Sequence, residues 1–391
     1  MIAANSMPVG KPEKTVVKVG YLPLTDCVAV IVAAALGFDK RYGITIEPCR
    51  EASWAAVRDK LVTGELDASQ ALYGLIYGVH LGLGGLQKDM AVLMTLNQNG
   101  QGITLAGQLA AEGVRDGAEL ARLIERQPRQ FTFAQTFPTG THAMWLYYWL
   151  AAHGIHPLAQ VKTTVVPPPL MVAALRGGQI DGYCAGEPWH SVAAAEGVGF
   201  TVTSSGAIWP DHPEKVLGAT AEWVAANPAT AVALTAALLD ASRFVDDVRN
   251  RDTVVALLAE HAGLPFSAAV LQAGLSGNCV AGGLKCFDEG RVNYPYLSDG
   301  MWFLTQYRRW GLLREEPDYL AVARQINQLA LYQQAAALAG VAMPSSSMRS
   351  STLVDGAMWD GRDPAGYAAS FTVRGATMAE WEGSRSPALW Q

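Results

Sequence analysis

The chain has 391 residues, a formal net charge of −6, 50% hydrophobic residues and 16% charged ones. This length predicts two domains, and this composition excludes global disorder because a large apolar core is available. No basic run is longer than Arg308-Arg309, which excludes a surface for nucleic acid or another polyanion.

The first 20 residues contain two prolines and several charged residues where a secretory signal would carry a run of about 7–15 apolar residues. We therefore expect neither an export signal nor a lipid anchor, and we expect no membrane span, so the prediction is a cytoplasmic protein. The five cysteines agree with a reducing compartment, because their number is odd and no C-x-x-C pair occurs. A bridge between Cys279 and Cys286 is the alternative left open.

The N-terminal region alternates between strand and helix patterns. Residues 15–20 and 44–47 predict strands, 28–36 an apolar helix that stops at Gly37, and 55–62 a second helix. This β-α-β-α order predicts a largely parallel sheet with helices on its faces.

One motif occurs twice, more than 100 residues apart. Residues 61–68 (LVTGELDA) and 175–182 (LRGGQIDG) share the pattern L-x-x-G-x-(L/I)-D-small. Each indicates the end of a helix, a glycine able to adopt positive φ, and a short strand that begins at an apolar–Asp pair. The repeat predicts the same supersecondary unit in each of two lobes.

The later elements divide the chain between these lobes. Strand patterns over 131–136 and 161–166 flank a predicted helix over 142–153, and residues 220–265 have helical spacing. We expect an α/β protein with a ligand cleft between its lobes. The first lobe is expected over 15–105 and 216–320, the second over 106–215, and a helical C-terminal extension, ending in an irregular strap, over 321–391.

Four loop-like segments carry hydrogen-bond donors: 52–54 (ASW), 97–102 (NQNGQG), 139–142 (TGTH) and 212–215 (HPEK). In an α/β sheet, ligands bind beyond the carboxyl ends of the strands. Trp54 and His142 each follow a predicted strand. Gln101 lies where the chain first passes between the lobes, and Lys215 where it returns. The sequence therefore predicts that these four side chains face one cleft.

The four side chains share a chemistry, because indole and ammonium groups only donate hydrogen bonds, and amide and imidazole groups can donate. The amides that open the helix near His142 add the positive end of a helix dipole. Nitrate, a planar monoanion with three acceptor oxygens and no donor, matches such a set. Bicarbonate would need an acceptor for its O–H, and these positions are better suited to donate.

Taken one at a time, each residue also fits an ordinary structural role. Trp54 is one of eleven tryptophans and fits a core, and Gln101 fits a Gly-rich turn. His142 fits a helix cap, and Lys215 a solvated surface. Only the convergence of all four would make a site.

Signals for catalysis are weaker. The chain has no P-loop, no G-x-G-x-x-G after a strand and no G-x-S-x-G. His153 and His156 have the spacing of metal ligands, but no third ligand accompanies them, so we expect no metal site and no cofactor. The chain is therefore predicted not to be an enzyme.

At these segments the sequence resembles the nitrate-binding proteins of the NrtA and CmpA type, which have the type II periplasmic-binding-protein fold. The similar stretches include SWAAVRDKL (53–61), LNQNGQGIT (96–104), FPTGTHAMWLYYWLAAHGI (137–155) and HPEKVLG (212–218). The resemblance implies nitrate ligands at Trp54, Gln101, His142 and Lys215. Secondary candidates are Ala55, Gly140, Thr141 and Pro168. In bicarbonate-binding relatives an acidic residue replaces the lysine, so Lys215 favours nitrate.

The transport members of this family are exported and anchored to lipid, and this sequence shows neither signal. It therefore looks more like the soluble NasS-type nitrate/nitrite sensors, which control nitrate assimilation. The resemblance then implies a partner, an RNA-binding antiterminator of the NasT type with an ANTAR domain, which the sensor sequesters until its ligand arrives. We expect no direct contact with nucleic acid or membrane.

Three other functions stay open. The first is a solute-binding receptor of a nitrate or bicarbonate ABC transporter. The second is an enzyme similar to the pyrimidine-precursor synthases of thiamine biosynthesis, which share this fold, although their cysteine-rich run is missing here. The third is a receptor for another small solute such as a sulfonate. Nitrate and nitrite are not separated, because they differ by one acceptor oxygen.

Overall fold

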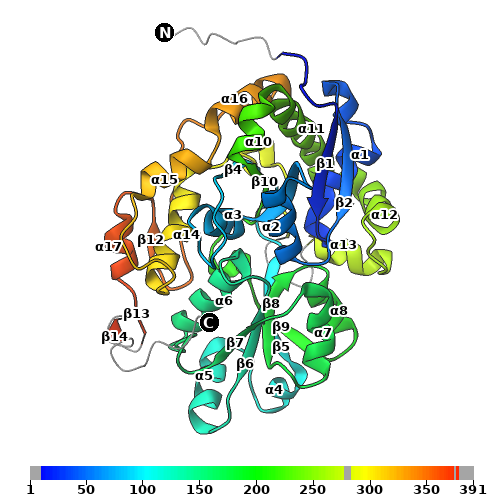
Figure 1. Ribbon diagram of the computed structural model, residues 1–391. Helices are drawn as coiled ribbons and strands as arrows, with labels where there is room; N and C mark the ends of the chain where they lie inside the picture. Colours follow the sequence, from blue (N-terminus) through cyan, green and yellow to red (C-terminus); the bar gives the residue numbers. More distant parts are fainter. Residues whose placement is uncertain (1–9, 277–282, 374–375, 378–391) are drawn as a thin grey trace.

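The computed structural model describes residues 10–276, 283–373 and 376–377, and the described chain forms two lobes placed one above the other in Figure 1. Each lobe is built on a five-stranded sheet with helices packed around it. The prediction of a two-lobed α/β protein is confirmed.

The sheet of lobe 1 has the strand order β2-β1-β3-β10-β4. Strand β1 is parallel to β2 and β3, as the β-α-β-α pattern predicts, whereas β10 runs antiparallel to β3 and β4. The strands are β1 (Val16–Tyr21), β2 (Thr45–Arg50), β3 (Ala68–Leu72), β4 (Met90–Thr95) and β10 (Lys215–Thr220). The helices of this lobe are α1 (Val28–Ala35), α2 (Trp54–Thr63), α3 (Tyr73–His80), α10 (Ala221–Ala226), α11 (Pro228–Asp246), α12 (Arg251–His261), α13 (Ala268–Ser276) and α14 (Leu297–Arg309).

Lobe 2 repeats this topology with other residues. Its order is β7-β6-β8-β5-β9, with β6 parallel to β7 and β8, and with β5 antiparallel to β8 and β9. The strands are β5 (Gln101–Ala106), β6 (Thr132–Gln135), β7 (Lys162–Val165), β8 (Gly182–Gly186) and β9 (Gly199–Ser204). The helices are α4 (Gly107–Ala111), α5 (Gly117–Arg126), α6 (Thr141–Ala152), α7 (Pro168–Arg176), α8 (Trp189–Ala195) and α9 (Ser205–Ile208).

The antiparallel strand of each sheet is the strand that arrives from the other lobe. Strand β5 follows β4 of lobe 1, and β10 follows β9 of lobe 2. The first crossing therefore lies near residue 100, beside Gln101 as expected, but the boundary expected at 105 assigned most of β5 to the wrong lobe. The Gly-rich segment resembles a turn, but Gly102 belongs to β5 and leaves room for His190 and Thr201, which an added Cβ would approach to within 3.4 Å. The return, at Lys215, is one residue from the expected boundary.

The repeated motif has the same structure in both lobes, as predicted. Gly64 and Gly178 adopt positive φ angles of 78° and 66° after the helices that they follow. The carboxylate of Asp67 accepts a hydrogen bond from the backbone N–H of Lys18, in the neighbouring parallel strand β1. Asp181 accepts the matching bond from Thr132. The two aspartates therefore have the same role, because each one binds the backbone of the neighbouring parallel strand.

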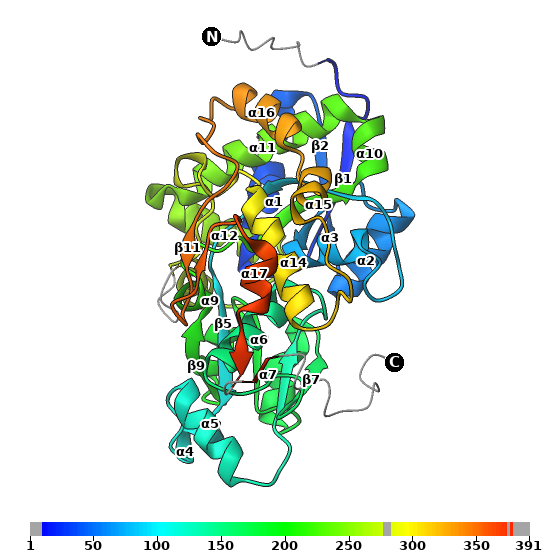
Figure 2. The same cartoon turned by 90° about the vertical axis from the view of Figure 1, so that its left-hand side faces the viewer.

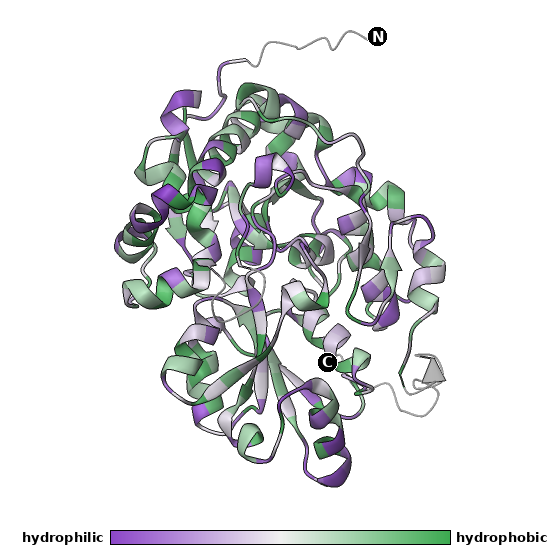
Figure 3. Ribbon diagram, turned by 180° about the vertical axis from the view of Figure 1, so that it is seen from behind, coloured by the Kyte–Doolittle hydropathy of each residue, from purple (hydrophilic) through white to green (hydrophobic). Residues whose placement is uncertain are grey.

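Lobe 1 contains a long apolar helix that the sequence analysis had not treated as a membrane candidate. Helix α11 is long and apolar enough to cross a membrane, but 78% of its apolar window is buried inside the protein, where it packs against α1 and α16 (Leu329–Leu338). Figure 3 shows hydrophilic residues on the outer helices and turns. Burial of this kind is expected of the core helix of a large lobe.

The C-terminal extension begins with α15 (Tyr319–Ile326) and α16, which pack on lobe 1, and continues as an irregular segment over 341–373, here called the strap (Figure 2). The strap carries β11 (Ser351–Thr352), β12 (Met358–Trp359), α17 (Pro364–Ala369) and β13 (Thr372–Val373), which pairs with β14 (Ala376–Thr377). The extension is thus helical in its first part and irregular in its second. Trp359 is buried, whereas Trp381 and Trp390 lie outside the described residues.

Candidate functional site

The two crossings between the lobes run side by side and form a hinge. The backbone N–H of Glu214 donates to the carbonyl of Asn97 over 3.1 Å, and Gln98 pairs with Pro213 as an isolated antiparallel bridge. A further contact joins the lobes beside the hinge, where Thr25 donates to the carbonyl of Glu187. Side chains that follow either crossing therefore lie at the boundary between the lobes.

The structure brings the four predicted residues together at this hinge. Trp54 is the first residue of α2, Gln101 the first of β5, His142 the second of α6, and Lys215 the first of β10. His142 Nε2 lies 2.7 Å from Gln101 Oε1. Lys215 Nζ lies 5.6 Å from the centre of the Trp54 ring. All four residues are at most 1% exposed.

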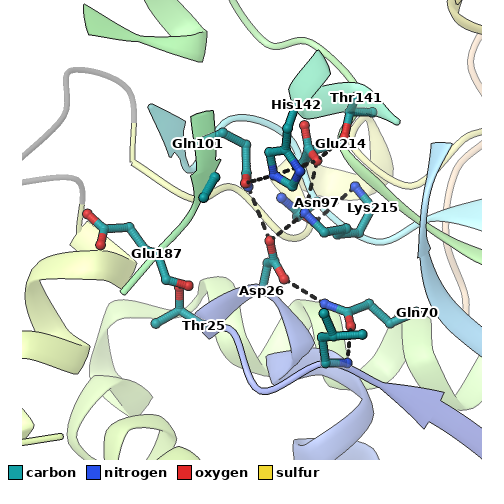
Figure 4. A network of polar contacts seen from close by, with 12 residues as sticks. Thr25, Asp26, Gln70, Asn97, Gln101, Thr141, His142, Glu187, Glu214 and Lys215 are labelled. Atoms are coloured by element: carbon teal, nitrogen blue, oxygen red, sulfur yellow. Dashed lines mark hydrogen bonds and ion pairs between the residues drawn. The ribbon is translucent and has the colours of Figure 1, made fainter. Parts of the chain in front are cut away.

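Two carboxylates complete the cluster, and the sequence analysis had not placed them there. Asp26, in the turn η1 (Thr25–Cys27) after β1, lies 2.8 Å from Lys215 Nζ and accepts from Gln101 Nε2 over 3.1 Å (Figure 4). Glu214 lies 2.9 Å from Lys215 Nζ. A site of donors alone with one positive charge is therefore wrong for this structure. We call the six residues the hinge cluster: Asp26, Trp54, Gln101, His142, Glu214 and Lys215.

One ammonium group faces two carboxylates in this cluster, and all three are almost fully buried. Burial lowers the pKa of Lys215, but the attraction of Asp26 and Glu214 outweighs it, so the pKa lies above its ordinary value. Burial raises the pKa of Asp26, and the nearby ammonium only partly offsets this effect. Lys215 is therefore held charged, with its charge already shared between two partners.

His142 is a neutral donor in this arrangement. Its Nε2 faces the Gln101 Oε1 atom, and its Nδ1 lies 2.7 Å from the hydroxyl of Thr136. Because Gln101 Nε2 donates to Asp26, Gln101 Oε1 is the acceptor, so the proton of the imidazole lies on Nε2. Burial, followed by the charge of Lys215, holds the pKa of His142 well below its ordinary value.

Glu214 is enclosed by donors from lobe 2. Thr141 Oγ1 donates to its Oε1 over 2.5 Å, and Trp145 Nε1 donates to its Oε2 over 2.8 Å. With Lys215, these contacts satisfy both oxygens of the carboxylate. Glu214 therefore ties α6 of lobe 2 to the hinge. This structural role could not be inferred from its position beside Lys215 in the sequence.

Trp54 is the member of the cluster whose donor is not used by the protein. Its Nε1 is buried and has no hydrogen-bond partner among the described residues. A buried N–H without a partner is uncommon in native proteins and costs about 1–3 kcal/mol. An acceptor from a ligand would satisfy this group. Helices α2 and α6 both begin at the cluster, so the positive ends of two helix dipoles reach it from opposite lobes.

The secondary candidates do not all share this position. Thr141 contacts Glu214, and Gly140 precedes it as the buried N-cap residue of α6. An added Cβ at Gly140 would lie 2.6 Å from the Leu72 side chain, so glycine is required for the close approach of the lobes. Ala55 is exposed on α2, and Pro168 is buried at the start of α7. Within the described part of the chain, neither forms a side-chain hydrogen bond or ion pair with the cluster.

The other chemical candidates have structural roles. His153 packs against Trp149 at the end of α6, and the Nδ1 of His156 accepts from the backbone of Leu158. Over the described part of the chain, no group of three His, Cys, Asp or Glu side chains is placed to hold a metal ion. Cys27, Cys49, Cys184 and Cys286 are free thiols. Cys279, which a bridge would need, lies outside the described residues.

One signal in the sequence pointed to Asp26. The rule that polar residues after strands gather at the carboxyl edge of a sheet was applied to Trp54 and His142, and Asp26 follows β1 in the same way. No comparable signal marked Glu214, because its role depends on Trp145 and Thr141, about 70 residues earlier in the chain.

Two α/β lobes joined by paired crossings, with buried polar groups gathered at the hinge, define a protein with the periplasmic-binding-protein fold. Residues 10–259 match the model of the NMT1-like family. The chain belongs to this family.

Relatives with known names cover most of the chain. The nitrate/nitrite binding protein NrtA of Synechocystis sp. is 34% identical over 93% of this chain and 86% of its own length. The bicarbonate transport ATP-binding protein CmpC of Synechococcus elongatus is 32% identical over 92% of this chain, which corresponds to 55% of that longer protein. These relatives are binding or transport proteins, in agreement with the prediction that the chain is not an enzyme.

Solved structures of binding proteins are similar to this chain as well. The periplasmic nitrate-binding protein NrtA from Synechocystis PCC 6803 has a TM-score of 0.88 at 33% identity, over 93% of this chain and 100% of that one. The alkanesulfonate-binding protein SsuA from Xanthomonas axonopodis pv. citri has a TM-score of 0.61 at 16% identity, over 80% of this chain and 98% of that one. The second similarity shows the fold alone.

Proposed function

We propose that the chain binds a small oxyanion, nitrate or nitrite, in the hinge cluster, and that the two lobes close on it. The observation that carries this proposal is the convergence of four donors from both lobes at one buried place, where the N–H of Trp54 has no partner among the described residues. The names of the NrtA relatives support the same class of ligand.

The chemistry of the cluster fits a monoanion. Lys215 supplies the positive charge and Trp54 an N–H group without a partner among the described residues. Gln101 and His142 supply N–H groups that exchange their present acceptors, Asp26 and Gln101 Oε1, for the ligand. A hydrogen bond to a charged group contributes about 1.5–3 kcal/mol, so a few such bonds account for useful affinity. Because donors come from both lobes, the ligand binds the closed arrangement better than an open one, and this difference drives closure.

Bicarbonate is the second candidate, and the carboxylates favour it. The four residues predicted from the sequence offer bicarbonate no good acceptor for its O–H, but Asp26 and Glu214 supply acceptors at the hinge. The bicarbonate transport relatives add support by name. Lys215 still favours nitrate, because the resemblance implies an acidic residue at this position in bicarbonate-binding proteins.

For the role in the cell, we propose a solute receptor of a transport system. The relatives are named as nitrate-binding or transport proteins, which supports this role over that of a NasS-type sensor. The sensor, its NasT-type antiterminator partner and a cytoplasmic location stay predictions. An antiterminator that co-purifies with the chain and dissociates on addition of nitrate would support the sensor function over the receptor function.

The substitution that tests anion binding with the least disturbance of the protein is Trp54→Phe. It removes the N–H group while keeping an aromatic ring, and the protein loses no hydrogen bond that the described residues show. We expect nitrate to bind about tenfold more weakly, as the loss of one charge-assisted bond implies. Isothermal calorimetry with nitrate, nitrite and bicarbonate measures the affinity, and thermal unfolding checks the fold.

The matched control is Trp223→Phe, because Trp223 on α10 also has a buried Nε1 without a hydrogen-bond partner among the described residues. It should leave the nitrate affinity unchanged. If Trp54→Phe also leaves it unchanged, the anion does not bind here. Substitution of Lys215 is a less specific test, because it leaves two buried carboxylates without their ammonium, at a cost of about 3–5 kcal/mol.

A further inference from the structure

Asp26 is surrounded by donors in the way that a bound anion would be. Its Oδ1 accepts from Gln70 Nε2 over 2.6 Å. Its Oδ2 accepts from Gln101 Nε2 over 3.1 Å and lies 2.8 Å from Lys215 Nζ. The side chain of Asp26 is 1% exposed, so these three contacts replace its hydration (Figure 4).

Two of these three donors are donors that the ligand needs. Lys215 Nζ is the positive charge of the cluster, and Gln101 Nε2 is an N–H group that points to the boundary between the lobes. Both are bonded to the same oxygen of Asp26, whereas Gln70 serves the other oxygen. Gln70 is fixed independently, because its Oε1 accepts from the backbone N–H of Leu22.

We propose that Asp26 is an internal competitor of the ligand, whose carboxylate occupies Lys215 and Gln101 until an external anion takes them over. This inference rests on the proposed anion-binding function and adds a residue that sets affinity and selectivity. The exchange frees only Oδ2, because Gln70 keeps Oδ1 in place. Asp26 therefore stays at the edge of the site, beside the bound ligand.

The carboxylate of Asp26 also selects against ligands that carry more than one negative charge. With Asp26 and Glu214 both near Lys215, the cluster already holds one negative charge in excess of its positive charge. A monoanion adds one further charge and a dianion adds two, in surroundings with little water to screen them. The arrangement thus favours nitrate or nitrite over sulfate, which is similar in its acceptors but doubly charged.

The variant Asp26→Asn tests this inference. It keeps the size of the side chain, removes its charge and leaves Lys215 paired with Glu214 as one cation and one anion. We expect nitrate to bind about tenfold more tightly than to the wild type, because the ligand no longer displaces a charged competitor. We also expect sulfate to bind measurably to the variant and not to the wild type. Calorimetry with both anions gives the affinities.

The matched control is Asp67→Asn, because Asp67 is a buried aspartate of lobe 1 that also accepts from a lysine, Lys14, over 2.7 Å. It lies before β3, away from the hinge, and should leave both affinities at the wild-type value. A second variant, Asp26→Ser, removes the carboxylate without adding an amide N–H and should also bind nitrate more tightly.

The outcomes separate the two proposals. If the wild type binds nitrate and the folded Asp26 variants bind it equally or more weakly, Asp26 is a positioning residue and not a competitor. If sulfate stays excluded from variants that bind nitrate more tightly, the selectivity part is wrong. If neither the wild type nor any variant binds nitrate, nitrite or bicarbonate, the proposed function itself fails.

Discussion

At the hinge, each buried polar side chain is held in one charge state by its neighbours. Lys215 stays an ammonium because two carboxylates face it, and His142 stays neutral because it is buried beside that ammonium. His212 is also held neutral, because burial lowers its pKa to about 3. Its Nδ1 donates to the carbonyl of Pro213, and its ring packs against Trp145.

This lowered pKa predicts a dependence of stability on pH. Between the ordinary pKa of 6.5 and about 3, the unfolded chain binds a proton at His212 and the folded chain does not. The free energy of unfolding therefore falls as the pH falls through this window, by at most about 1.4 kcal/mol per pH unit for this residue. Urea unfolding of His212→Gln between pH 6 and 4 should show a shallower fall than the wild type.

The difference between the wild type and His212→Gln isolates the contribution of His212 to the pH dependence of stability from that of the other buried groups. His142 and His190 act with the same sign, because their pKa values are also lowered by burial. Asp26 and Asp299 act with the opposite sign, because burial raises theirs. His261→Gln, an exposed histidine on α12, serves as the control. Equal slopes for wild type and His212→Gln would contradict the assignment.

At the level of elements, the lobes meet through a helix with glycines on one face. Helix α3 of lobe 1 carries Gly74 and Gly78, one turn apart, against the loop before α6 of lobe 2. The Tyr307 hydroxyl, from α14, lies within hydrogen-bond distance of the carbonyls of Gly74 and Thr139 and joins the two segments. This contact positions the start of α6, and with it His142.

We predict that Gly74→Ala destabilises the protein although alanine favours helices. An added Cβ would overlap the Thr139 carbonyl oxygen and would lie 2.8 Å from the Tyr307 hydroxyl. Helix propensity contributes about 1 kcal/mol in favour of alanine, whereas overpacking against backbone costs about 1–3 kcal/mol. Denaturant unfolding should show a net loss of stability, and nitrate should bind more weakly because α6 is displaced.

Gly177→Ala is the control for this substitution. Gly177 ends α7 with a φ of −76°, and its added Cβ would meet nothing closer than 3.4 Å. It should change stability by less than about 0.5 kcal/mol. A Gly74→Ala protein as stable as this control would show that α3 and the Thr139 loop can separate without cost.

At the scale of the whole molecule, the strap links both lobes to the hinge. On lobe 1, Arg349 pairs with Asp299 of α14 over 2.7 Å. At the hinge, the same arginine donates to the carbonyl of Asp211 over 2.7 Å. On lobe 2, the hydroxyl of Tyr148 lies 2.9 and 3.0 Å from the two carboxylate oxygens of Asp355. Any opening of the lobes therefore changes contacts of the strap.

We predict that Asp355→Ala weakens ligand binding without loss of the fold. Asp355 is exposed, so its removal leaves no buried charge behind, but it removes the hydrogen bond between the strap and Tyr148 of lobe 2. The backbone bond from Val354 to Ile208 remains, so the strap is loosened and not detached. The closed arrangement then loses about 1 kcal/mol relative to the open one, which lowers nitrate affinity several-fold. Calorimetry gives the affinity, and small-angle scattering of the ligand-free protein should show a larger radius of gyration.

Asp360→Ala is the control within the same strap, because Asp360 pairs with Arg362 of the strap itself. It should match the wild type in both measurements. An Asp355→Ala protein that also matches the wild type would mean that the strap does not restrain the lobes.

The sequence by itself determined the local elements, the repeated motif and the four donor residues. Strands β1 and β6 and helices α1 and α6 lie within two residues of their predicted bounds, because hydrophobic periodicity and terminating glycines act over a few residues. The Asp of each repeat lies directly before a short strand in both lobes, and its carboxylate accepts a hydrogen bond from the backbone of the neighbouring strand.

The tertiary structure decided the strand order, the place of β5 in lobe 2 and the charge balance of the hinge. Lys215 meets Asp26 across 189 positions of the chain, and Glu214 meets Trp145 across 69. No pattern in the sequence reports such pairs, because they depend on how two sheets are joined. Burial then fixes their protonation, since a charge away from water is stable only beside a partner that folding supplies.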